Sequence, residues 1–163
     1  MRWKLAAAWA IALGSFWVTW PWMGFALGRA VVPGSVEWIE PDSLVRALGG
    51  DTPPLVLDVR EPDEFAVSHI PGAIRFPPGS AMTDAIREAP LVVVYCSVGV
   101  RSGREAERLA ESGVRVLNLE GAIFRWAMEG RPLVNAAGPT PFVHPYDGLW
   151  GRLLPAELHG WPR

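Results

Sequence analysis

The stretch that decides the fold is Leu91-Val92-Val93-Val94-Tyr95-Cys96-Ser97-Val98-Gly99-Val100-Arg101-Ser102. It begins with a short, continuous apolar run, which is typical of a strand buried on both faces of a parallel sheet. The pattern over residues 102–112 predicts a helix, with Ser102 and Glu105 as a capping box at its start. A short glycine-containing loop joins the two and carries the only cysteine of the chain. The stretch therefore predicts an α/β domain with a cysteine at the carboxyl end of a strand.

Strands and helices alternate on both sides of this stretch. Further strands are predicted at residues 36–40, 55–59, 73–76 and 115–119, and further helices at residues 41–48, 61–67, 80–88 and 123–129. This alternation is typical of a parallel sheet covered by helices on both faces. The chain has 163 residues, enough for one such domain and an appendage.

The bulk composition excludes some classes of protein. The formal net charge is −2 and the basic residues are scattered, so nothing indicates a nucleic-acid partner. With one cysteine the chain forms no internal disulfide. The thiol is then either inert packing or a reactive group.

The N-terminus, residues 1–29, differs from the rest. Arg2 and Lys4 precede an uncharged run from Leu5 to Gly28 that contains four tryptophans. Roughly 20 apolar residues span a bilayer as a helix. We expect an N-terminal hydrophobic helix, as an uncleaved anchor or a cleaved signal peptide; a buried core helix is less favoured because no polar face interrupts the run. The charges before the run place residues 30–163 outside the cytoplasm, in the periplasm or at the cell exterior.

Three further segments follow. Residues 30–35 are interpreted as a linker and residues 36–133 as the α/β domain. Residues 134–163 are rich in proline and contain several aromatic side chains. We expect this C-terminal extension to be irregular in structure but packed against the domain, because a free tail would not retain such aromatics.

The loop after the strand has the features of an anion site beside a reactive thiol. Its backbone N–H groups can curl into a nest, and the helix that follows adds its positive end. Arg101 adds a full charge, and Gly99 permits tight curvature. Together these favour a Cys96 thiolate with a bound anion over inert packing. The predicted nucleophile is Cys96, and the predicted substrate-binding residues are Ser97, Val98, Gly99, Val100, Arg101 and Ser102.

This loop resembles the active-site loop of rhodanese-type sulfurtransferases. Two further segments resemble the family's motifs in the right order: residues 57–73, which include Leu57-Asp58-Val59-Arg60-Glu61 and His69-Ile70-Pro71-Gly72, and residues 119–132, which end in Glu129-Gly130-Arg131-Pro132. Coverage runs from about Val36 to Leu133. The resemblance implies a single rhodanese domain with a five-stranded parallel sheet. The chain departs from the family at Ser68 and Ala122, where glycine is common.

The resemblance also implies a mechanism. The Cys96 thiolate attacks the outer sulfur of a small anionic donor such as thiosulfate, becomes a persulfide, and passes the sulfur to a thiol or cyanide. No cofactor or metal is implied, and His69 has no companion at metal-ligand spacing. Related phosphatases and arsenate reductases have one more residue between cysteine and arginine, so the loop favours sulfur chemistry. The alternative is a sulfur carrier or a membrane-tethered module that serves a protein partner.

Asp58 and Arg60 are predicted to support the site, and His69 and Trp126 have structural interpretations. Asp58 ends a strand on the same side as Cys96 and is predicted to orient the loop. Arg60 is predicted to pair with Glu64 in a structural ion pair. His69 is interpreted as a hydrogen-bonding turn residue rather than a general base, and Trp126 as core or pocket wall.

Overall fold

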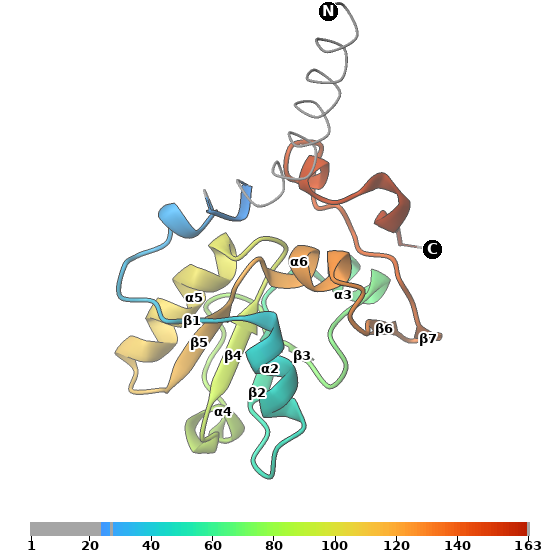
Figure 1. Ribbon diagram of the computed structural model, residues 1–163. Helices are drawn as coiled ribbons and strands as arrows, with labels where there is room; N and C mark the ends of the chain where they lie inside the picture. Colours follow the sequence, from blue (N-terminus) through green and yellow to red (C-terminus); the bar gives the residue numbers. More distant parts are fainter. Residues whose placement is uncertain (1–23, 27, 163) are drawn as a thin grey trace, which may run out of the picture.

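The computed structural model describes residues 24–26 and 28–162, so most of the predicted N-terminal hydrophobic segment lies outside the described residues. Its centre is a parallel five-stranded sheet in the order β1-β5-β4-β2-β3 (Figure 1). The strands are β1 (Trp38–Ile39), β2 (Leu55–Asp58), β3 (Ile74–Arg75), β4 (Val92–Tyr95) and β5 (Val116–Leu119). The predicted α/β class and the five-stranded parallel sheet are confirmed.

The central strand β4 is buried on both faces, as its apolar run predicts. Val93 and Tyr95 belong to one apolar cluster, and Val92 and Val94 to another. Since side chains alternate across a strand, the two clusters are the two layers above and below the sheet. On the neighbouring strand β2, Val56 lies beside Val93 in the first cluster and Leu57 lies beside Val94 in the second.

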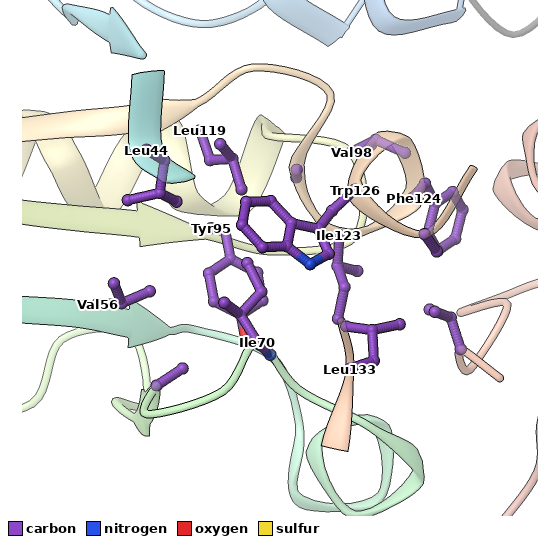
Figure 2. Packing of buried hydrophobic residues seen from close by; sticks show 14 of the residues in the cluster. Leu44, Val56, Ile70, Tyr95, Val98, Leu119, Ile123, Phe124, Trp126 and Leu133 are labelled. Atoms are coloured by element: carbon purple, nitrogen blue, oxygen red, sulfur yellow. Dashed lines mark hydrogen bonds between the residues drawn. The ribbon is translucent and has the colours of Figure 1, made fainter. Parts of the chain in front are cut away.

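Two helices cover each face. The helices α2 (Pro41–Leu48) and α6 (Ala122–Met128) pack on the first cluster, and α4 (Asp84–Glu88) and α5 (Val100–Glu111) on the second. Figure 2 shows the first layer, where Trp126 and Ile123 of α6 lie over Tyr95 of β4. The helix α3 (Pro62–Val67) follows the carboxyl end of β2. This arrangement leaves that end of the sheet to the loops that carry the predicted site.

Two predicted helix starts are wrong. The helix α5 begins at Val100 because Gly99, at φ +101°, serves as its N-cap. Ser102 therefore lies inside the first turn, and no Ser102–Glu105 capping box forms; Glu105 instead binds Arg108 and the backbone N–H of Gly79. The helix α4 begins at Asp84 rather than at the predicted residue 80, because Thr83 is its N-cap and has an extended backbone.

The chain on either side of the domain packs at one end of the sheet, where α5 begins (Figure 1). Phe25 is only 4% exposed and belongs to the first cluster. The extension contains a short hairpin, β6 (Val134–Asn135) and β7 (Gly138–Pro139), and the 3₁₀ turns η1 (Trp150–Leu153) and η2 (Ala156–Leu158). Along residues 24–26 and 28–162, no helix is long and apolar enough to cross a membrane.

Candidate active site

Cys96 lies at the carboxyl end of β4 and its side chain is buried. The N–H of Gly99 donates to its Sγ over 3.1 Å. This geometry requires the left-handed backbone of Gly99, and a Cβ at this position would also lie 3.1 Å from the ring of Trp38. Glycine at 99 is therefore what lets the loop close over the sulfur.

Hydrogen bonds from α6 and β5 to the carbonyl oxygens of the loop hold it in place. At the start of α6, the N–H groups of Ile123 and Phe124 donate to the carbonyls of Cys96 and Ser97, each over 3.2 Å. On β5, the side-chain amide of Asn118 donates to the carbonyl of Gly99 over 2.8 Å. The position of the sulfur is thus set by two neighbouring elements, which is the kind of support that a nucleophile needs.

Of the remaining predicted loop residues, some are buried by packing and others form hydrogen bonds. Val98 is buried in the first apolar cluster, and Ser102 is buried in the first turn of α5. Ser97 Oγ donates to Glu64 over 2.9 Å and accepts from Arg101 over 3.0 Å. Only Arg101 and Val100 keep partly exposed side chains, so these two residues border the approach to the loop.

Arg101 does not point freely into solvent; Glu64 of α3 holds it. Its two terminal nitrogens donate to the two carboxylate oxygens of Glu64, each over 2.8 Å, in a bidentate pair. Burial by itself would lower the pKa of Arg101, but the Glu64 hydrogen bond and the nearby charges of Cys96 and Glu64 outweigh it and raise that pKa. The guanidinium therefore stays charged beside the thiol at every physiological pH.

The predicted Arg60–Glu64 pair is wrong. Arg60 is fully buried and binds Asp58, with Nε and Nη2 donating over 2.9 and 2.7 Å. Its Nη2 also donates to the carbonyl of Ser68 over 2.6 Å. Arg60 follows Asp58 by two residues at the end of β2 and its side chain turns back onto Asp58, whereas Glu64 faces Ser97 and Arg101 of the Cys96 loop. Arg60 therefore does not line the approach to Cys96.

Asp58 lies beside Tyr95, the residue that precedes Cys96, in the register of β2 and β4. Burial is the main cause that raises the pKa of Tyr95 well above its usual range, so the phenol stays protonated. Its oxygen accepts from the N–H of Ile70 over 3.1 Å. This buried network supports the strand that delivers the cysteine.

His69 and Trp126 have structural surroundings. The His69 ring stacks on Phe65 at 3.9 Å, and its Nδ1 lies 3.1 Å from the Phe65 carbonyl. Trp126 is buried and donates to the carbonyl of Pro132 over 2.9 Å. Among the described residues, no group of histidine, cysteine and acidic side chains is placed to hold a metal ion.

Two residues of the site were not assigned to it from the sequence. Glu64 stands in the segment Asp63-Glu64-Phe65, and its place in the first turn of a helix at the carboxyl end of the sheet was the available signal. Tyr146 of the C-terminal extension stacks on Arg101, with the guanidinium carbon 4.4 Å from the ring centre. No periodic pattern or motif marks Tyr146, so only the aromatic composition of the extension pointed toward it.

Glu64 should make the stability of the protein depend on pH. Burial would raise the pKa of Glu64, but hydrogen bonds from Arg101, Glu61 and Ser97 and the Arg101 charge lower it below its ordinary value of 4.5. The stabilisation is therefore complete above about pH 4.5 and is lost as the pH falls through the lowered value. In urea unfolding from pH 7 to 3, Glu64→Gln should flatten this acid loss, because the group that titrates has been removed.

The control for this measurement is Glu111→Gln, at an exposed position at the end of α5. Its stability should follow that of the unmodified chain at every pH. If Glu64→Gln and Glu111→Gln show the same pH dependence, the Glu64–Arg101 pair is not the source of the acid loss.

Comparison with known proteins identifies the family of this domain. The Rhodanese-like domain family matches residues 40–129, more than half of the chain. A protein of Allochromatium vinosum named "Sulfurtransferase" is 36% identical over 107 residues, which cover 63% of this chain and 99% of that relative.

Two solved structures have the same fold. A rhodanese-related protein from Thermoplasma volcanium matches with a TM-score of 0.50 and 30% identity over 60% of this chain and 97% of that one. Thiosulfate sulfurtransferase from Pseudomonas aeruginosa matches with a TM-score of 0.54 and 25% identity over 61% of this chain and 20% of that one. The chain belongs to the rhodanese-like domain family.

Proposed function

We propose that this protein transfers sulfane sulfur through a persulfide on Cys96. The observation that supports this most directly is the Gly99 N–H that meets the Cys96 sulfur at 3.1 Å, at the end of the central strand. A sulfur atom in this position, in a family that contains named sulfurtransferases, is suited to nucleophilic catalysis.

In the first step the Cys96 thiolate attacks the outer sulfur of thiosulfate. A sulfur–sulfur bond to Cys96 forms as the bond to the sulfonate sulfur breaks, and sulfite leaves with the electron pair of that bond. The product is a persulfide anion on Cys96, so charge and sulfur balance. The N–H of Gly99 and the charge of Arg101 lie where they can stabilise this anion.

In the second step the terminal sulfur of the persulfide is attacked by cyanide or by a thiolate. The new bond to sulfur forms as the bond to Cys96 breaks, and the Cys96 thiolate is restored. Because the two substrates react in turn at one sulfur, we expect ping-pong kinetics. Thiosulfate as the donor is suggested by the Pseudomonas aeruginosa relative, whose name states that donor.

The test uses the full chain with thiosulfate and cyanide, and measures thiocyanate release together with the mass of the intact protein. Turnover, with a mass gain of one sulfur atom before cyanide is added, is the expected result. A mass gain without turnover would favour the alternative, a sulfur carrier whose acceptor is another protein. The absence of both turnover and mass gain would refute both the enzyme and the carrier hypothesis.

We also propose that the N-terminal segment, residues 1–29, targets the domain out of the cytoplasm, as a membrane anchor or an export signal. The support is the uncharged run behind Arg2 and Lys4. Phe25 packs in the core of the domain, so cleavage after Gly28 would uncover the apolar cluster that contains it. A C-terminal reporter that works only in the periplasm should be active; an inactive fusion would refute the outward placement.

A further inference from the structure

The C-terminal extension is built onto the active-site end of the sheet. Three of its buried side chains, Val143, Leu153 and Leu154, join the first apolar cluster together with Val98 of the Cys96 loop. Leu153 also lies directly against Gly24, so the extension meets the segment that precedes the domain there. In Figure 1 the red part of the extension lies beyond α6, the helix that holds the loop, at the end of the sheet where α5 begins.

Hydrogen bonds fix the extension in this position. The N–H of Val143 donates to the carbonyl of Leu158 over 2.8 Å, and the N–H of Gly160 donates to the carbonyl of Val143 over 2.9 Å. The carboxylate of Asp147 accepts from the N–H groups of Leu149 and Trp150, each over 2.8 Å. The turn that carries Tyr146 is therefore held on both sides.

Tyr146 itself has a strained backbone. Its φ is +68°, in the left-handed region, which costs a residue other than glycine on the order of 1 kcal/mol. The N–H of Tyr146 donates to Nδ1 of His144 over 3.1 Å, which fixes this conformation. The strained turn places the Tyr146 ring on the exposed face of Arg101, 4.4 Å from its guanidinium carbon. Strain that persists beside reactive groups is a reason to look for a function.

We propose that Tyr146 is a specificity-determining residue that restricts the Cys96 site to small sulfur donors and acceptors. This inference rests on the proposed function. Cys96 is only 1% exposed, so any substrate must pass the rim of its loop. Arg101 forms part of that rim, and the Tyr146 ring stands on it as an added wall. Thiosulfate and cyanide are narrow enough to pass such a wall, whereas a peptide-sized thiol meets the ring.

Because Cys96 is the only cysteine, its accessibility can be measured without any sulfur transfer. The full chain is labelled with iodoacetamide and with a bulky fluorescein maleimide, and the ratio of the two rate constants is compared. The ratio cancels any change in the fraction of thiolate, so it reports how readily the larger reagent reaches the sulfur relative to the smaller one. We expect Tyr146→Ala to raise the bulky-to-small ratio by about tenfold, which corresponds to a modest steric barrier.

Two variants serve as controls. Tyr146→Phe keeps the ring and should leave the ratio unchanged, and so should Leu149→Ala, an exposed position on the same extension. A ratio in Tyr146→Ala equal to that of the unmodified chain would overturn the proposal. A rise of the same size in Leu149→Ala would also overturn it, because the extension would then have loosened as a whole.

Turnover gives the second readout. With thiosulfate as donor, Tyr146→Ala should raise kcat/KM for glutathione as acceptor relative to cyanide, again by about tenfold. If the unmodified chain transfers no sulfur, the proposed function fails, while the labelling ratio still decides the role of Tyr146. If transfer occurs but both ratios stay unchanged, only the role of Tyr146 fails.

Discussion

Replacing Cys96 with serine is expected to lower the rate of thiocyanate formation from thiosulfate and cyanide to the rate without protein. The loss should be on the order of 10³-fold or more, because the covalent intermediate is removed and no second cysteine can replace it. A serine hydroxyl forms no persulfide, so the mass gain of one sulfur atom should vanish as well.

Cys96→Ser should remove the reactive sulfur without disturbing the fold. Serine fits the volume of the buried cysteine, and the Gly99 N–H that donates to Sγ can donate to a hydroxyl oxygen instead. Urea unfolding of Cys96→Ser should therefore give a transition of the same slope as the unmodified chain. A variant that is folded and still turns over would show that sulfur does not pass through Cys96.

The sheet and the cysteine loop were predictable because local pattern and tertiary position agree there. The apolar run of β4 is buried on both faces, and a parallel sheet requires such a strand at its centre. The glycine and the arginine that follow then mark a tight loop before a helix. Because of this agreement, the sequence alone predicts a reactive cysteine at the carboxyl end of β4.

The partners of the charged residues were less predictable, because they depend on where side chains point. Arg60 stands within reach of Asp58 in the extended chain and of Glu64 one helical turn later. Spacing alone does not choose between them. The choice follows from the tertiary structure, in which Arg60 is fully buried against Asp58 and Glu64 pairs with Arg101.

The start of α5 shows a similar limit. Ser102 and Glu105 have capping-box spacing, but Gly99, in the left-handed conformation three residues before Ser102, is the N-cap of the helix instead.

The role of Tyr146 could not be predicted from the sequence for another reason. Its contact with Arg101 joins two segments far apart in the chain, and the extension has no periodic pattern that would place it.

Replacing Arg60 with methionine is expected to destabilise the protein by about 3–5 kcal/mol, because it leaves the buried Asp58 carboxylate without its partner. Both side chains are fully buried, and Nη2 of Arg60 lies 2.7 Å from Oδ2 of Asp58. The Ser68 carbonyl loses its donor as well. Burial acts to lower the pKa of Arg60, but the Asp58 charge and hydrogen bond raise it, so the arginine stays charged at all accessible pH values. The measurement is urea unfolding at pH 7.

Arg87→Met is the matched control. Arg87 pairs with Asp84 on the surface, where the side chains are 54% and 88% exposed, and such a pair contributes about 0–1 kcal/mol to stability.

The double variant Asp58→Leu/Arg60→Met leaves no buried charge unpaired. It should therefore be more stable than Arg60→Met alone, because an apolar pair of similar volume can replace a buried ion pair. Equal losses in Arg60→Met and Arg87→Met would mean that water reaches Asp58. In that case the Asp58–Arg60 pair beside Tyr95 would not be a water-excluded support for the strand that carries Cys96.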